Sequence, residues 1–389
     1  MVHSRPEART DLTMTRFEAA SRTLRAIAKA SGFDGSDEAR AVAVFRTLAD
    51  SWAHMPVSAP PPWSGLGADA SGCDVSMVLD GARSEIRVTV EAQGNPPSPQ
   101  AYWDAAMHLS ETLEARYGAD LSRLRSLADI FRPLDPSAAG VLWHGAVFQN
   151  GKAPWFKVYL HLMATGRDKA RSTARAALER LGLDESWGAI ESRLQDADEL
   201  LFLSFDLVPA EAARVKIYIR HAEATAATLD RAAQVPGSDN AANIRSFVDE
   251  LVGSGNRIIR RGALTSLHLK RGSNAPIHAS THVRLYPHCA TSDSVLFTRV
   301  QRVLRRLGIP SAPYESAIAA LATRAPEDEG THGWASIQCT HQGPSVTVYL
   351  SPRLYFDQHG PIALDPPRMW PSPVEPTASS TRQPACASR

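Results

Sequence analysis

The sequence predicts an α+β fold in which ten antiparallel strands close into a barrel with a solvent-accessible lumen, ringed by helices. Strand-like segments occur in adjacent pairs, helical segments separate one pair from the next, and this helix-strand-strand-helix unit occurs five times. Adjacent strands form hairpins, whereas a parallel sheet needs single strands between helices. Because no strand reads as an edge, we expect the sheet to close.

The first unit contains two helices, a hairpin and a third helix. Apolar or small residues recur at helical spacing over 16–31 and 38–53. Strand-like runs at 71–79 and 85–92 flank Asp80-Gly81, a dipeptide typical of hairpin turns. The helical pattern at 100–117 ends before Gly118, a plausible C-cap residue.

The remaining units repeat this order. They comprise strands at 139–149 and 154–162, helices at 167–183 and 187–195, strands at 199–207 and 212–221, a helix at 240–253, strands at 263–271 and 277–287, a helix at 294–306, and strands at 332–341 and 344–351. We expect a flexible N-terminus over 1–14, a single barrel domain over 15–358 and a disordered tail rich in Pro and Ser over 359–389.

A basic residue followed two positions later by tyrosine recurs on the second strand of the hairpins. Residues i and i+2 share one face of a strand, so the pair points to the same side of the barrel. The aligned positions are Arg87-x-Thr89, Lys157-x-Tyr159, Lys216-x-Tyr218, Arg284-x-Tyr286 and Thr347-x-Tyr349. A polar face on a single strand usually means solvent, but recurrence in three complete copies predicts a ring of cations beside a ring of tyrosines in the lumen.

This pair of rings indicates the ligand chemistry. Cations enclosed together repel one another unless a highly charged anion lies among them, and diphosphate is a natural partner of Arg and Lys. Tyrosine faces attract cations by roughly 0.5–2 kcal/mol each. We therefore infer ionisation of an allylic diphosphate, with the carbocation shielded until an electron-rich ring captures it.

Composition and missing motifs exclude other classes. The net charge of +1 gives no field for nucleic acid or an anionic membrane, and no run is long enough for a membrane helix. The sequence has no DDxxD, P-loop, HExxH or GxSxG motif, so we expect no metal site and no essential Mg²⁺. The four cysteines lack CxxC spacing and are expected to be free thiols in a cytoplasmic protein.

Four strand motifs resemble a known family. PWFKVYL (154–160), ARVKIYIRH (213–221), HVRLYP (282–287) and VTVYLSP (346–352) resemble the bacterial branch of the dimethylallyltryptophan synthase family of indole prenyltransferases, over about residues 16 to 355. The resemblance implies an αββα (ABBA) barrel, dimethylallyl diphosphate as donor, and tryptophan or a tryptophan-derived acceptor such as an indolactam or cyclic dipeptide. It also implies a role in alkaloid or other secondary metabolism.

The resemblance assigns roles to individual residues. The diphosphate ligands would be Arg87, Lys157, Arg214, Lys216 and Arg284. The carbocation shield would be Tyr159, Tyr218, Tyr286 and Tyr349, and Trp155 would belong to the acceptor pocket.

Asp74 and His144 are the candidate catalytic residues. Family members carry a carboxylate on the first barrel strand that accepts the indole N–H, and Asp74 occupies that place. Asp74 is shorter than the usual Glu, which leaves open whether free tryptophan is the acceptor and how deep in the pocket it binds. His144 falls where fungal members carry a proton-removing Lys, and a neutral imidazole can accept a proton. Alternatively, Asp74 is a surface carboxylate, or the base for attack by the indole nitrogen, and His144 is a structural histidine.

Two other functions stay open at this stage. A related barrel could prenylate a phenol, a hydroxynaphthalene or tyrosine, and a barrel without catalysis could bind an anionic or prenylated ligand. In the preferred interpretation the partners are dimethylallyl diphosphate and an indole acceptor, with no cofactor, no nucleic acid and no membrane. We expect a monomer or a weak homodimer.

Overall fold

The computed structural model describes residues 14–355, apart from 68, 82–83, 137, 139, 210, 237–240, 260–261, 286–291, 322–329 and 341. The residues predicted to form the flexible N-terminus and the Pro/Ser-rich tail therefore lie almost wholly outside this range, as do Tyr286, Cys289 and Cys386. Cys73 and Cys339 are buried free thiols.

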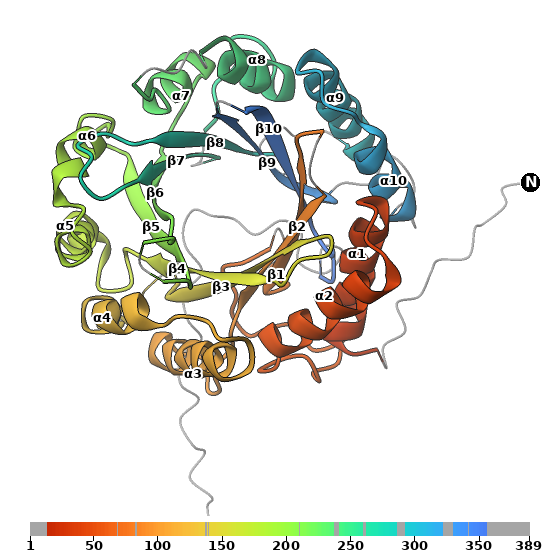
Figure 1. The fold of residues 1–389 in the computed structure, drawn as a ribbon, viewed down its shortest axis with the longest axis horizontal. Coiled ribbons are helices and arrows are strands. Elements are labelled where there is room, and N and C mark those ends of the chain that lie inside the picture. Colours follow the sequence, from red (N-terminus) through yellow and green to blue (C-terminus); the bar gives the residue numbers. More distant parts are fainter. Residues whose placement is uncertain are drawn as a thin grey trace, which may run out of the picture.

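Ten antiparallel strands form one closed barrel, as the sequence predicted (Figure 1). The strands are β1 (Cys73–Leu79), β2 (Glu85–Glu91), β3 (Leu142–Gln149), β4 (Trp155–His161), β5 (Glu199–Asp206), β6 (Val215–His221), β7 (Ala263–Leu269), β8 (His278–Arg284), β9 (His332–Thr340) and β10 (Gly343–Leu350). Each strand pairs with its neighbours in sequence, and β1 pairs with β10 to close the barrel. No backbone edge is left open in such a sheet.

Helices surround the barrel on its outer side (Figure 1). They are α1 (Arg16–Ala30), α2 (Gly35–Leu48), α3 (Pro99–Tyr117), α4 (Ser122–Phe131), α5 (Ala170–Arg180), α6 (Trp187–Glu191), α7 (Ala226–Ala232), α8 (Ala241–Val252), α9 (Asp293–Arg306) and α10 (Ala312–Leu321). The sequence did not predict α4, α7 and α10, and α6 is shorter than expected. Local signals fix several ends: Thr15 and Glu18 form a capping box at α1, and Gly118 ends α3 in the left-handed region.

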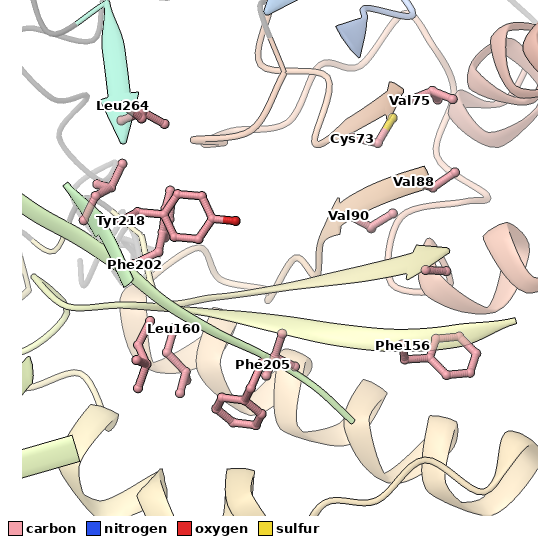
Figure 2. Close-up of a cluster of buried hydrophobic side chains, with 14 of the residues drawn as sticks. Cys73, Val75, Val88, Val90, Phe156, Leu160, Phe202, Phe205, Tyr218 and Leu264 are labelled. Atoms are coloured by element: carbon pink, nitrogen blue, oxygen red, sulfur yellow. The ribbon is translucent and has the colours of Figure 1, made fainter. Parts of the chain in front are cut away.

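The hydrophobic core lies between the outer face of the barrel and the helices. Val88, Val158, Ile217 and Val348, which alternate with the lumen residues, are all fully buried there. Figure 2 shows Phe156, Leu160 and Phe205 pointing toward the helices, whereas Tyr218 points toward the lumen. The period-two alternation of the strands thus separates an aliphatic outer face from a polar and aromatic inner face.

Candidate functional site

The register of the strands sets the height of each lumen side chain. Arg87 on β2 is in register with Val147 on β3, and Val147 with Trp155 on β4. The charged neighbour of Arg87 on β4 is nevertheless Lys157, two residues further along. Strands in a barrel are tilted against its axis, so two residues that are paired in register do not lie at the same height along that axis. From one hairpin to the next, the residue at the same height is two positions further along the strand than the residue paired in register.

The same advance identifies the residue of β8 that lies level with Lys216. Lys216 is in register with His268 on β7, and His268 with His278 on β8. Two residues beyond His278 is Ser280, whereas Arg284 lies four residues beyond Ser280. Arg284 is therefore not level with Lys216, although the recurring triplet aligned the two.

Repeated around the barrel, this rule gives three layers of side chains on the even-numbered strands. The basic layer is Arg87, Lys157, Lys216, Ser280 and Thr347. The tyrosine layer is Thr89, Tyr159, Tyr218, His282 and Tyr349. The third layer is Glu91, His161, Arg220 and Arg284.

The basic layer concentrates positive charge around two lysines. Arg87 donates to Glu85 Oε1 from Nε at 2.7 Å, and Arg214, just below the layer, donates to Asp206 Oδ2 from Nε at 2.6 Å. Within the described part of the chain, the ammonium groups of Lys157 and Lys216 have no hydrogen-bond or ion-pair partner. The sequence-predicted ligands Arg87, Lys157, Arg214 and Lys216 are thus brought together.

The cost of this arrangement is visible in the lysine pKa values. Burial, and then the charge of Arg87, lowers the pKa of Lys157 from its ordinary value to about 7. Burial, and then Lys157, lowers the pKa of Lys216 well below its ordinary value. An anion among these groups would favour their charged forms again. The cluster therefore suits a ligand with several negative charges, such as a diphosphate.

The tyrosine layer lies directly above the cations. The ring centroids of Tyr159 and Tyr218 are 6.1 Å apart, and Phe202 lies 5.8 Å from Tyr218. Side-chain hydrogen bonds hold Tyr218 to Ser204 and Tyr349 to Ser336. Burial raises the pKa of each phenol, so the rings stay neutral and present aromatic faces to the lumen. Tyr286, predicted to complete this shield, lies outside the described residues.

A cavity opens on the other side of the tyrosine layer. Its walls include every member of that layer, together with His161, Arg220 and Arg284 of the third layer. Trp143, Trp334 and residues 63–67 also line it. The cavity volume is about 190 Å³, on a measure by which a single water needs roughly 10–15 Å³. It therefore accommodates a small organic molecule.

Asp74 faces this cavity, where the sequence placed a carboxylate to hold the acceptor. Burial, and then the charge of Asp69, raises its pKa to about 7, and the opposite charge of Arg284 limits the rise. In the described part of the chain Asp74 makes no hydrogen bond to another protein group. Its oxygens are available to accept a bond from a bound molecule.

Arg284 belongs to the cavity and not to the cation cluster. Its guanidinium lies 6.0 Å above the ring of Trp334 and interacts electrostatically with Asp74. The charges that act on Lys157 and Lys216 do not include it. The structure therefore does not bring Arg284 together with the other predicted diphosphate ligands, because the tilt of the strands carries it two layers above Lys216.

His144 is on the outer face of β3, so its placement in the lumen is wrong. It is in register with Val90 and Val158, and its Nε2 lies 2.8 Å from Ser110 Oγ on α3. Burial lowers its pKa to about 3. The lumen positions of β3 are instead Trp143 and Gly145, one residue to either side.

Trp155 also lies away from the cavity. It is in register with Val147 at the level below Lys157, and it is not part of the cavity wall. Its assignment to the acceptor pocket is wrong, because the sequence motif gives the face of a strand but not the depth. The tryptophans of the cavity are Trp63, Trp143 and Trp334.

Sequence reasoning missed Glu91, which organises one end of the cavity. Its Oε1 accepts from Trp143 Nε1 at 2.7 Å, and its Oε2 accepts from Ser64 Oγ at 2.6 Å. Burial raises its pKa to about 7. A single carboxyl group thus fixes both an aromatic wall and the loop 63–67. The signal was available, since Glu91 continues the alternation of Arg87 and Thr89 along β2.

Two further findings concern the part of the chain that the structure describes. Within the described residues, no group of three or more His, Cys, Asp or Glu side chains is placed to hold a metal ion. In the same part of the chain, no helix combines the length and the apolar character that a membrane crossing requires.

Comparison with known proteins gives consistent matches. A family model described as tryptophan dimethylallyltransferase matches residues 18–316. The 6-dimethylallyltryptophan synthase from Micromonospora olivasterospora, solved in complex with DMASPP and Trp, is 29% identical with a TM-score of 0.82, covering 90% of this chain and 100% of its own. The 5-dimethylallyl tryptophan synthase from Streptomyces coelicolor, also with DMASPP and Trp, is 25% identical with a TM-score of 0.81, covering 88% and 96%. The prenyltransferase PriB, in a ternary complex with L-tryptophan and dimethylallyl thiolodiphosphate, is 27% identical with a TM-score of 0.80, covering 88% and 97%.

Proposed function

The chain belongs to the tryptophan dimethylallyltransferase family and is an aromatic prenyltransferase, and we propose that it joins a dimethylallyl group to the indole ring of tryptophan or a tryptophan-derived molecule. The observation that supports this most strongly is the order of the layers. A cation cluster with two unpartnered lysines, a layer of tyrosines and a cavity with an open carboxylate follow one another along a single lumen.

The donor binds with its diphosphate in the basic layer. Arg87, Lys157, Arg214 and Lys216 surround the phosphate oxygens, and the dimethylallyl group extends into the tyrosine layer. The C1–O bond breaks with its electron pair passing to the diphosphate, whose growing charge these cations stabilise. The developing allyl cation is then enclosed by Tyr159, Tyr218 and Tyr349, whose faces attract it by roughly 0.5–2 kcal/mol each and exclude water.

The acceptor occupies the cavity with its ring against the cation. Asp74 accepts a hydrogen bond from the indole N–H, which fixes the ring and increases its electron density. Trp143 on β3 and Trp334 on β9 supply flat walls of the cavity. A π-electron pair of the indole then forms the new bond between one ring carbon and the dimethylallyl cation. Which carbon reacts depends on the orientation in which the cavity walls hold the ring.

Charge balance in the third layer is compatible with a zwitterionic or uncharged acceptor. Arg220 is bonded to Glu199, which also pairs with Arg167, and Arg284 lies near Asp74. Three arginines thus face two carboxylates here, an excess of one positive charge, whereas four cations face two carboxylates in the basic layer. Tryptophan, indolactams and cyclic dipeptides are each zwitterionic or uncharged.

The decisive experiment supplies dimethylallyl diphosphate with a panel of L-tryptophan, an indolactam, tryptophan-containing cyclic dipeptides, tyrosine and a hydroxynaphthalene. Mass spectrometry and NMR identify the product and the position of attachment. We expect prenylated indoles; products from the phenols alone, or release of diphosphate without transfer to any ring, would contradict the proposal.

The same assay tests the need for a metal. The cations can neutralise the leaving group directly, so we propose that turnover continues in EDTA. Loss of all activity in EDTA, with recovery on adding Mg²⁺, would contradict a metal-independent reaction. Cytoplasmic location and a monomeric or weakly dimeric state stay predictions.

A further inference from the structure

The tyrosine layer carries one imidazole. On β8, the position level with Tyr218 is His282, whose ring centroid lies 5.8 Å from that of Tyr218. Its Nε2 lies 3.4 Å from the hydroxyl oxygen of Ser266, and its side chain forms part of the cavity wall. His282 therefore faces the space in which the allyl cation and the acceptor ring meet.

The proposed reaction requires a proton acceptor at this height. The attacked ring carbon still carries its hydrogen after the C–C bond forms, and that carbon lies next to the tyrosine layer because it has bonded to C1. Strand β3, which was expected to supply the base, offers the lumen only Gly145 and Trp143 here. A side chain at Gly145 would collide with Lys157, since its Cβ would lie 2.9 Å from Lys157 Cγ.

The other groups near this point are poor acceptors. Burial raises the pKa of Tyr159, Tyr218 and Tyr349, so these phenols hold their protons. Lys157 and Lys216 would be held in the charged form by a bound diphosphate. Asp74 is engaged by the indole N–H in the proposed function.

We propose that His282 is the catalytic residue that accepts the ring proton after prenylation. The C–H bond breaks, its electron pair restores the aromatic ring, and the proton passes to the lone pair on the unprotonated ring nitrogen of the imidazole. The site then carries one new positive charge beside the departing diphosphate. This inference rests on the proposed function and adds the residue that completes its chemistry.

Electrostatics suit such a step. Burial and then Lys216 and Arg87 lower the pKa of His282 to about 3, so the imidazole is neutral and has a lone pair to offer. A bound diphosphate neutralises the same two cations and favours the protonated ring. An alkylated ring that has lost its aromaticity is a strong acid, so a weak base is sufficient.

The test compares His282→Tyr with His282→Gln. The tyrosine variant completes the aromatic layer but removes the base, so it separates shielding from proton transfer. We measure turnover with L-tryptophan and with ring-deuterated L-tryptophan, and we measure the affinity for inorganic diphosphate. Both variants should lose about 10²–10⁴-fold in turnover, the usual contribution of a general base. They should also gain a primary isotope effect and keep their diphosphate affinity.

Other outcomes overturn the inference. If His282→Tyr turns over as fast as the parent, or if both variants are slow without any isotope effect, His282 has only a packing or shielding role. His161→Gln is the matched comparison, because His161 also lines the cavity but lies one layer higher; it should raise the KM for tryptophan without an isotope effect. Failure of the proposed function itself would be distinct, since the unmodified enzyme would then prenylate no indole.

Discussion

The two ends of the lumen hold similar residues in different electrostatic states. In the basic layer, the carboxylates Glu85 and Asp206 pair with the two arginines, and among the described residues Lys157 and Lys216 have no ion-pair partner. In the third layer, Arg220 is bonded to Glu199 and Arg284 faces Asp74. The basic layer has an excess of two positive charges, and the third layer, where Arg167 also pairs with Glu199, has an excess of one. The larger positive charge therefore distinguishes the end that binds an anionic leaving group from the end that binds an indole.

Among the substitutions that compare the two ends of the lumen, removal of a lysine of the basic layer should have the largest effect. Lys216→Met should weaken the binding of inorganic diphosphate by about 10- to 100-fold, since a hydrogen bond to a charged group contributes about 1.5–3 kcal/mol. Turnover should fall at least as much. Calorimetric titration measures the first and product formation the second. Lys152→Met, on the exposed β3–β4 turn, is the control for losing one positive charge. Equal diphosphate affinities in the two variants would contradict the proposal that the basic layer binds the diphosphate.

Arg284→Met sharpens the contrast between the two ends. We expect the KM for L-tryptophan to rise by about tenfold, because loss of the guanidinium changes the charge around Asp74 and removes the contact with Trp334. Affinity for inorganic diphosphate should stay within about twofold of the parent, since Arg284 lies two layers above Lys216. A loss of diphosphate affinity like that of Lys216→Met would show that the layers are wrongly assigned.

The pH dependence should have opposite signs at the two ends. The pKa of Lys157 is lowered to about 7, so above pH 7 the binding of diphosphate requires Lys157 to take up a proton, and the affinity should fall by up to about tenfold per pH unit. The pKa of Asp74 is raised to about 7, so its acceptor capacity, and the affinity for an indole N–H, should increase as pH rises through 7.

Two substitutions test separately the fall in diphosphate affinity and the rise in acceptor affinity with pH. Lys157→Arg keeps its charge at every working pH and should reduce the decline in diphosphate affinity to the part that Lys216 contributes. Asp74→Asn cannot ionise and should abolish the rise in acceptor affinity. If the diphosphate affinity of Lys157→Arg, or the acceptor affinity of Asp74→Asn, still varies with pH as in the parent, the titrating group is another residue.

The smallest effect is expected on the outer face. His144→Leu removes the contact with Ser110 Oγ and should lower the free energy of unfolding by about 1 kcal/mol. Turnover per folded molecule should not change, because His144 faces α3 and not the lumen. Urea unfolding and active-site titration give the two quantities. A loss of turnover at unchanged stability would indicate that His144 has a catalytic role.

Several features of the site were predictable because they depend on short-range pattern. Lys157-x-Tyr159 and Lys216-x-Tyr218 were placed correctly, since alternation fixes which residues of one strand share a face. The residues between them, Val158 and Ile217, lie on the outer face for the same reason. Asp74 was also placed in the lumen, although its role in binding the acceptor stays a prediction.

The errors arise where two strands must be related to each other. His144 was misplaced because a difference of one residue in pairing reverses the face of a strand. Arg284 was misplaced because its Arg-x-Tyr motif imitates the triplet, while β8 is shifted against β6 in the closed barrel. The contacts of Glu91 with the loop 63–67 and with Trp143 could not be predicted, because these partners are distant from it in sequence.

The sequence by itself determined the hairpins, their number and order, the aliphatic outer face, and the chemistry of a basic residue followed by a tyrosine. These depend on periodicity within a strand and on repetition along the chain. Only the tertiary structure decided which side chains stand at equal height, since that depends on the tilt and shear of the closed sheet. The triplet thus predicted cations and tyrosines in the lumen, and the register placed Arg284 with the cavity and His282 among the tyrosines.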